Sequence, residues 1–135
     1  MKEFIIYSDG AYSPSRNQGG CAFVILEGDK KVFSFKKMFK NTTNQRMEVI
    51  AACIALESIK NPSKVKIYSD SAYLVCTINK GWKRKVNLDL WERLDKAIAR
   101  HSEVTFEWVK GHDSNKYNAM ADELAVEASN QVDIY

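Results

Sequence analysis

Hydrophobic residues gather in five short runs rich in β-branched and aromatic side chains, and such runs predict β-strands. Three runs come early in the chain, and the last two alternate with helical patterns. Successive strands are typical of an antiparallel meander, whereas strands alternating with helices are typical of parallel pairing. The five predicted strands cover residues 4–7, 21–26, 32–39, 65–68 and 104–109.

Four further segments carry apolar residues at helical spacing. Residues 44–59 carry them on several faces, which predicts a helix buried over much of its circumference. A short helix is predicted at residues 72–78, and a last helix is predicted to open after a cap at Asn118. The remaining apolar stripes consist of Leu90, Trp91, Leu94 and Ile98, and of Ala121, Leu124, Ala125 and Ala128.

This order of elements favours an α/β fold with a five-stranded mixed sheet, in which three antiparallel strands precede two parallel ones, flanked by helices. The chain has 135 residues, two prolines, and no repeat, linker or low-complexity segment. A chain of this length buries about two thirds of its unfolded surface and folds without disulfides or a structural metal. We therefore expect a single domain over residues 1–135.

The net charge and the cysteines limit the possible partners and the cellular compartment of the protein but do not identify its function. The net charge of +3 permits binding to a polyanion without establishing it. Cys21, Cys53 and Cys76 lie in apolar stretches without CxxC spacing, which suits a reducing compartment. No apolar run reaches the roughly 18 residues of a membrane span, and the start does not resemble a signal peptide. We expect a cytoplasmic monomer that does not contact membranes.

Four acidic residues stand against the local pattern: Asp9, Glu48, Asp70 and Asp122 lie among apolar or small residues. An unpaired carboxylate is costly to bury, and no neighbouring cation obviously neutralises any of them. Asp9 and Asp70 are predicted at the carboxyl ends of the first and fourth strands, where open α/β sheets build their sites. Glu48 is expected early in the long helix and Asp122 in the first turn of the last one.

If these acids converge, their repulsion raises some of their pKa values unless cations are bound, so the cluster predicts a metal site. Oxygen ligands indicate Mg²⁺ or Mn²⁺ rather than zinc. Each acid also has a structural explanation. Asp9 before Gly10 is a turn signal, Asp70 suits a helix cap, Asp122 suits a helix macrodipole, and Glu48 suits a solvated face.

The strings YSDGAYSPSRNQGG, TTNQRMEVIAACIALE, YSDSAYLV, NLDLWERLDKAI and VKGHDSNKYNAMADELA resemble type 1 ribonuclease H in the same order over nearly the whole chain. The resemblance implies a ribonuclease H-like fold and endonucleolytic cleavage of the RNA strand of RNA–DNA hybrids, leaving 3′-hydroxyl and 5′-phosphate ends. It implies two Mg²⁺ ions, with Mn²⁺ as a substitute, held by Asp9, Glu48, Asp70 and Asp122. His112 is implied as an auxiliary in proton transfer or product release; a solvated loop histidine is the alternative.

Two groups of residues are expected to bind the hybrid. One precedes Glu48 and offers hydroxyl, amide and guanidinium groups, although Thr43 or Asn44 also suits a helix cap. The other is a basic patch with an aromatic residue, for which a solvated charge run is the alternative. The first group is Thr43, Asn44, Gln45 and Arg46, and the second is Trp82, Lys83, Arg84, Lys85 and Asn87.

The chain departs from the family pattern at several points. Only five residues separate Trp82 from Leu88, so the helix and basic loop that many members insert there are missing. Ser15 and Ala72 replace larger polar residues, and we expect no N-terminal hybrid-binding module. Hybrid binding is therefore expected to be weaker and more sensitive to salt. The alternatives are a non-catalytic nucleic-acid-binding module on the same fold and an integrase-like DNA nuclease.

Overall fold

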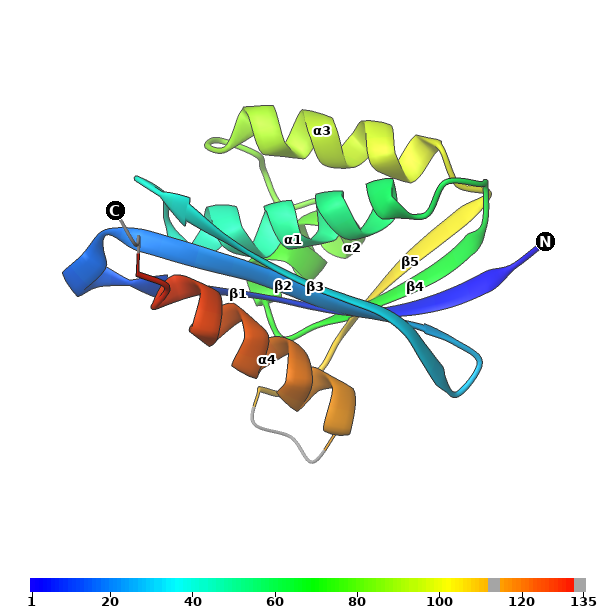
Figure 1. The fold of residues 1–135 in the computed structure, drawn as a ribbon. Coiled ribbons are helices and arrows are strands. Elements are labelled where there is room, and N and C mark those ends of the chain that lie inside the picture. The colour runs from blue at the N-terminus through cyan, green and yellow to red at the C-terminus, as the bar shows by residue number, and fades with distance from the viewer. Residues whose placement is uncertain (112–114, 133–135) are drawn as a thin grey trace.

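A five-stranded sheet forms the centre of the computed structural model, which describes residues 1–111 and 115–132 (Figure 1). The strand order is β3-β2-β1-β4-β5, with antiparallel pairing among the first three strands of the chain and parallel pairing from β1 to β4 to β5. The predicted α/β fold with a mixed sheet is thus confirmed. The strands are β1 (Glu3–Ser13), β2 (Gln18–Glu27), β3 (Lys30–Lys40), β4 (Lys64–Ser69) and β5 (Glu103–Trp108).

Helices cover both faces of the sheet, three on one side and one on the other (Figure 1). The first face carries α1 and α2, and α3 packs on the outer side of α1. The opposite face carries α4, which contacts β1, β2 and β3. None of the helices in the described ranges is long and apolar enough to cross a bilayer. The helices are α1 (Asn44–Ser58), α2 (Ala72–Lys80), α3 (Leu88–Ala99) and α4 (Lys116–Ser129), with a 3₁₀ turn, η1 (Pro14–Arg16), after β1.

The main hydrophobic core lies between the sheet and α1. Helix α3 covers the side of α1 that faces away from the sheet. Helix α1 is therefore buried on several faces, as its apolar pattern predicts. Cys53 is fully buried there, and its thiol donates to the carbonyl oxygen of Leu90 across 3.6 Å. A smaller core under α4 contains Tyr7, Val24 and Ala121.

Two glycines let helices approach the strands closely. A Cβ atom at Gly10 would lie 2.6 Å from the backbone nitrogen of Glu48, and one at Gly20 would overlap the carbonyl oxygen of Ala125. Gly10 pairs with Cys21 within the β1–β2 ladder, so the turn interpretation of the Asp9–Gly10 pair is wrong. This glycine is needed for the approach of α1 rather than for a change of chain direction.

Strand β1 is longer than the predicted residues 4–7. Its pairing with β4 ends at Tyr7, but its pairing with β2 continues to Ser13. Asp9 therefore lies inside β1 instead of at its end. The polar and small residues after Tyr7 do not read as a strand, and only the partner β2 keeps them extended.

The last helix begins earlier than predicted. Its cap is Asn115, whose Oδ1 accepts the backbone N–H groups of Tyr117 and Asn118 at 2.9 and 3.0 Å. Asn118 is buried within the helix, so its assignment as the cap is wrong. Asp122 consequently lies in the second turn, where the helix macrodipole contributes little.

A buried histidine that the sequence pattern did not single out ties three segments together. His101 is 8% exposed, and its Nδ1 accepts the backbone N–H of Ser63 at 3.2 Å. Its Nε2 lies 2.9 Å from the carbonyl oxygen of Leu56, at the end of α1. The imidazole therefore satisfies two backbone groups that burial would otherwise leave without partners.

Replacing Gly10 with alanine tests the close approach of α1. We expect Gly10→Ala to lower the free energy of unfolding by about 2–3 kcal/mol, because the added methyl group forces α1 off the strand. Gly28→Ala is the control, since its Cβ meets nothing within 4 Å and only the positive φ of 63° costs about 1 kcal/mol. Urea unfolding measures both values, and equal losses would contradict the packing argument.

Candidate active site

Two aspartates lie at the same level of the sheet, where β1 and β4 separate. Pairing of the strands ends at Tyr7 and Tyr68, whose rings stack with centroids 5.0 Å apart and an angle of 15°. Asp9 and Asp70 each lie two residues further along the chain, Asp9 within β1 and Asp70 directly after β4. Beyond this level β1 stays beside β2, while the chain after β4 turns into α2. The parallel pairing that was expected to make Asp9 and Asp70 neighbours is confirmed.

Glu48 reaches this level from α1. The helix begins after Thr43, whose side chain accepts the backbone N–H of Arg46 at 3.1 Å, so the predicted cap at Thr43 is confirmed. Asn44 Nδ2 donates to Glu48 Oε1 across 3.5 Å. Because Gly10 has no side chain, the backbone of Glu48 lies directly against β1, close to Asp9.

Asp122 reaches the same level from the opposite face of the sheet, on α4. Its side chain shares a hydrogen bond with the carboxyl group of Asp9. Asp9 is only 5% exposed, so this contact is shielded from water. Four elements, β1, α1, α4 and the end of β4, thus each bring one carboxylate toward the point of strand separation.

Burial and neighbouring charge make the anionic forms of two of these acids costly. Burial is the main cause that raises the pKa of Asp9 to about 9, and the charge of Asp70 and the hydrogen bond with Asp122 add to it. The backbone N–H of Gly10, which donates to Asp9 Oδ1 at 2.9 Å, opposes the rise. Burial likewise raises the pKa of Glu48 to about 7; Asp70 adds to this, and a hydrogen bond with Ser71 opposes it.

Contacts with the chain after β5 also hold Asp70. Trp108 Nε1 donates to the carbonyl oxygen of Asp70 at 3.1 Å, and a Cβ atom at Gly111 would lie 3.2 Å from Asp70 Oδ2. The helix-cap interpretation of Asp70 is wrong, because Ser71 caps α2 by accepting the N–H of Leu74 at 3.0 Å. The Asp70 side chain is therefore not used as the cap of α2.

The carboxylates interact in pairs. Asp9 interacts with Asp70 and with Asp122, and Glu48 interacts with Asp70. Within residues 1–111 and 115–132, no three acidic, histidine or cysteine side chains have the geometry of a preformed metal site. Carboxylate oxygens nevertheless fit Mg²⁺ or Mn²⁺, and a bound cation would reverse the repulsion that raises the pKa of Asp9. His112, the predicted auxiliary, lies outside the described residues.

Two of the predicted hybrid-binding residues take part in a network inside the protein. Arg46 donates to both carboxylate oxygens of Asp89, at 3.0 and 2.8 Å, and to Asn87 Oδ1 at 3.3 Å. Asn87 has a φ of 59°, and its Nδ2 donates to the hydroxyl of Tyr73 at 3.1 Å. Arg46 and Asn87 therefore join the start of α3 to α1 and α2, whereas Thr43, Asn44 and Gln45 are exposed.

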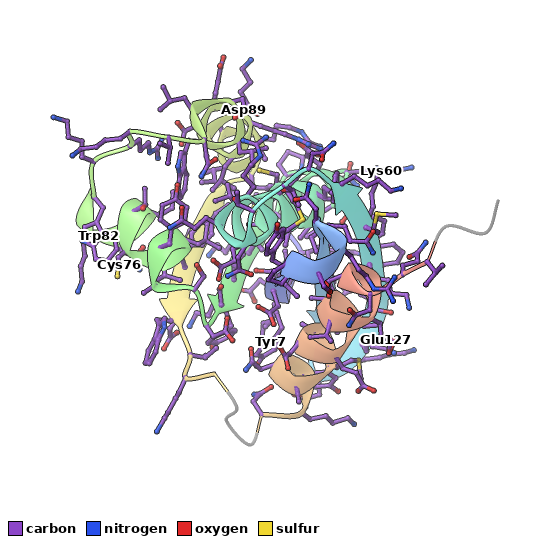
Figure 2. All side chains as sticks on the ribbon, turned by 90° about the vertical axis from the view of Figure 1, so that its left-hand side faces the viewer. Tyr7, Lys60, Cys76, Trp82, Asp89 and Glu127 are labelled. Atoms are coloured by element: carbon purple, nitrogen blue, oxygen red, sulfur yellow. The ribbon has the colours of Figure 1, made fainter. Side chains whose placement is uncertain are left out.

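The segment between α2 and α3 is short. It runs from Gly81, which ends α2 with a φ of 66°, to Asn87, and it contains no helix. Trp82 is 47% exposed and projects at the edge of the molecule (Figure 2).

Within the basic patch, Arg84 differs from its neighbours. Its Nη1 lies 2.6 Å from Asp95 Oδ2, and its guanidinium group lies 5.1 Å from the centre of the Trp91 ring. Lys83 and Lys85 are exposed and form no ion pair with any described residue. These two lysines are therefore the members of the patch that remain available to phosphates.

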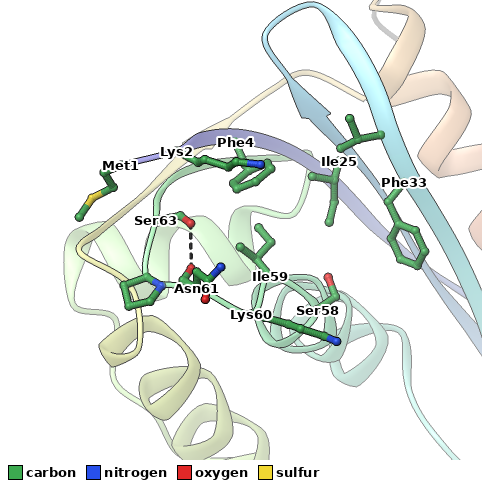
Figure 3. Close-up of a pocket in the computed structure, with 12 residues that line it drawn as sticks. Met1, Lys2, Phe4, Ile25, Phe33, Ser58, Ile59, Lys60, Asn61 and Ser63 are labelled. Carbon is green, nitrogen blue, oxygen red and sulfur yellow. Dashed lines mark hydrogen bonds between the residues drawn. The ribbon is translucent and has the colours of Figure 1, made fainter.

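A pocket of about 470 Å³ lies away from the carboxylates (Figure 3). It is formed by the start of the chain, the β2–β3 hairpin and the segment after α1, and its apolar lining includes Phe4, Phe33 and Ile59. None of the four acids lines it. The candidate active site is thus defined by converging carboxylates rather than by this pocket.

Comparisons with known proteins agree on the family. The RNase H family model matches residues 1–130. The chain is 44% identical to the ribonuclease H of Caldicellulosiruptor saccharolyticus, over 93% of this chain and 94% of that protein. It is 40% identical to the ribonuclease H of Syntrophus aciditrophicus, over 99% of this chain and 84% of that protein. The chain belongs to the ribonuclease H family, which is a family of nucleases.

Solved structures support the same fold. The N-terminal RNase H domain of a Mycobacterium tuberculosis protein superposes with a TM-score of 0.85 at 20% identity, covering 96% of this chain and 95% of that one. RNase H1 of Halobacterium salinarum superposes with a TM-score of 0.79 at 22% identity, covering 93% and 96%. The alignment with the Syntrophus protein spans 148 positions against the 135 residues of this chain, so that relative has residues without a counterpart here.

Neutralising Asp9 should stabilise the chain when divalent ions are absent. Because the pKa of Asp9 is about 9 when folded, against an ordinary value of 3.8, ionisation opposes folding as the pH rises between these values. We expect Asp9→Asn to raise the free energy of unfolding by about 2–4 kcal/mol at pH 7, and by almost nothing below about pH 4. Urea unfolding in chelator from acid to neutral pH measures this.

The matched control is Asp29→Asn, at an exposed turn between β2 and β3. Because its side chain is exposed, this substitution should change the free energy of unfolding by less than about 0.5 kcal/mol. Saturating Mg²⁺ should stabilise the wild-type chain more than Asp9→Asn. A gain in Asp9→Asn that does not vary with pH would contradict the assigned cause.

Proposed function

We propose that this chain is a metal-dependent endoribonuclease that hydrolyses the RNA strand of RNA–DNA hybrids. The observation that carries the proposal is the convergence of Asp9, Glu48, Asp70 and Asp122 from four elements, with burial and repulsion raising the pKa of Asp9. Proteins of this family generally use divalent metal ions and act on RNA–DNA hybrids. The shared fold and the similarity to proteins named ribonuclease H support the assignment.

The arrangement suggests unequal roles for the four acids. Asp9 interacts with carboxylates on both sides, so it is the residue suited to bridge two ions. Glu48 and Asp70 would complete one ion's ligands, and Asp122 the other's. Held by these four acids, Mg²⁺ would supply the acidity that activates an attacking water and the charge that stabilises a leaving 3′ oxygen, a reaction that would give 5′-phosphate and 3′-hydroxyl ends. His112 would move a proton or assist product release.

Residues around Glu48 would distinguish the RNA strand of the hybrid from its DNA strand. The Glu48 carboxylate would accept a hydrogen bond from a ribose 2′-hydroxyl, the group that distinguishes RNA from DNA. Thr43, Asn44 and Gln45 are exposed at the same end of α1 and would contact the groove edges and backbone of the hybrid. Recognition and catalysis would then share one end of this helix.

A cleavage assay with separate substrates tests the proposal. The chain is incubated with labelled RNA–DNA hybrid, double-stranded RNA or double-stranded DNA, each with Mg²⁺, Mn²⁺ or chelator. We expect cleavage of the RNA in the hybrid only, and only with a metal. Asp70→Asn should lower the rate at least roughly 100-fold, because it removes a charge that the transition state requires.

Asp29→Asn, in the exposed β2–β3 turn, is the matched control and should cut at the wild-type rate. Binding without cleavage under every metal would favour a non-catalytic module. Cleavage of double-stranded DNA would favour an integrase-like nuclease. Full activity of Asp70→Asn would also contradict the proposed roles.

Lys83 and Lys85 provide a separate test of hybrid binding. Each phosphate contact that is lost should lower the slope of log affinity against log salt by about one. We expect Lys83→Ala with Lys85→Ala to weaken hybrid binding and to reduce this slope, measured with chelator so that the hybrid stays intact. Lys30→Ala, at the β2–β3 hairpin, is the control. Equal slopes in the double variant and the wild type would show that these lysines do not contact the phosphates of the hybrid.

A further inference from the structure

Both the oxygen and the nitrogen of the Asn115 side-chain amide form hydrogen bonds. Its oxygen caps α4 by accepting the N–H groups of Tyr117 and Asn118. Its nitrogen donates to the hydroxyl of Tyr7 at 3.2 Å. One side chain therefore joins the start of the last helix to the central strand, across 108 positions of sequence.

Tyr7 lies immediately below the carboxylate level. It precedes Asp9 by two residues, so both side chains point to the α4 face of β1. The residue is 8% exposed, its ring stacks on Tyr68, and the centre of the ring lies 6.0 Å from that of Tyr117. The phenol is thus held firmly enough to act as a fixed anchor for Asn115.

The position of α4 matters for the site because this helix carries Asp122, which shares a hydrogen bond with Asp9. The fully buried residues of α4 are mostly small, and its larger apolar residues, Tyr117, Met120 and Leu124, are only partly buried against the core. A directional bond near the start of the helix therefore contributes more to its placement than it would on a helix with large interlocking side chains. The buried residues of α4 are Asn118, Ala121, Ala125, Ala128 and Ser129.

We propose that Tyr7 and Asn115 form a tether that places Asp122 against Asp9, and so sets the separation between two carboxylates that hold a divalent ion. Both are positioning residues, since neither is placed to touch substrate or the reacting atoms. The part of this inference that concerns the ion rests on the proposed nuclease function. The part that concerns the placement of α4 does not.

Three variants test the tether. Tyr7→Phe removes the hydroxyl and keeps the ring, while Asn115→Ser keeps a good helix cap but is too short to reach Tyr7. Tyr68→Phe is the matched control, because it removes a hydroxyl from the stacked partner ring, whereas the amide of Asn115 donates to the hydroxyl of Tyr7. Mn²⁺ binding by calorimetry without nucleic acid, and kcat and KM on a labelled hybrid, are the first two measurements.

We expect Tyr7→Phe and Asn115→Ser each to weaken Mn²⁺ binding or lower kcat by roughly 10-fold, as outer-shell changes do, with KM little changed. The double variant should be no worse than the single ones, since both break the same bond. Tyr68→Phe should stay within about two-fold of the wild type. Wild-type behaviour of Tyr7→Phe, or an equal loss in Tyr68→Phe, would overturn the inference.

A third measurement separates this inference from the proposed function. Amide hydrogen exchange in the first two turns of α4 needs no metal and no substrate, and we expect it to be faster in Tyr7→Phe than in Tyr68→Phe. Failure of the wild-type chain to bind Mn²⁺ or cut a hybrid would refute the nuclease function alone. Equal exchange in the two variants would refute the tether, whatever the activity.

Discussion

The cost of ionising Asp9, which is buried beside other carboxylates, is the constraint on which the arrangement of this protein depends. Burial and the nearby Asp70 raise the pKa of Asp9 to about 9, so the anionic cluster opposes folding unless a cation is present. The surrounding elements must nevertheless hold the carboxyl groups near one another. Ionisation of such a site is unfavourable in the folded chain, and a bound divalent ion would offset that cost.

The means of holding the cluster are short-range contacts that leave little freedom to the backbone. The stacked rings of Tyr7 and Tyr68 fix the relative level of β1 and β4 below the aspartates. The absence of a side chain at Gly10 lets α1 press Glu48 against β1. These contacts act on strands and helix ends, which are rigid elements, so the carboxylates are placed more accurately than loops would place them.

Local patterns predicted the existence and type of every strand and α-helix in the described part of the chain, because alternation, helical spacing and capping residues are properties of neighbouring residues. These predictions were incomplete where the conformation or contacts of a residue depend on a partner remote in sequence. Strand β1 continues past Tyr7 only because β2 keeps pairing with it. For Arg46 and Asn87, which suit nucleic acid by residue type, only the structure shows partners inside the protein: Asp89 for Arg46 and Tyr73 for Asn87.

The sequence by itself indicated the class of fold and singled out four acids whose oxygen ligands predict Mg²⁺ or Mn²⁺, since these inferences follow from residue type, spacing and the cost of burying charge. Only the tertiary structure decided which carboxylates interact, which positive charges are already paired, and how Asn115 joins α4 to β1. The physical reason is that these properties depend on distances between segments remote in sequence. Such distances are set by the packing of the whole core rather than by any local pattern.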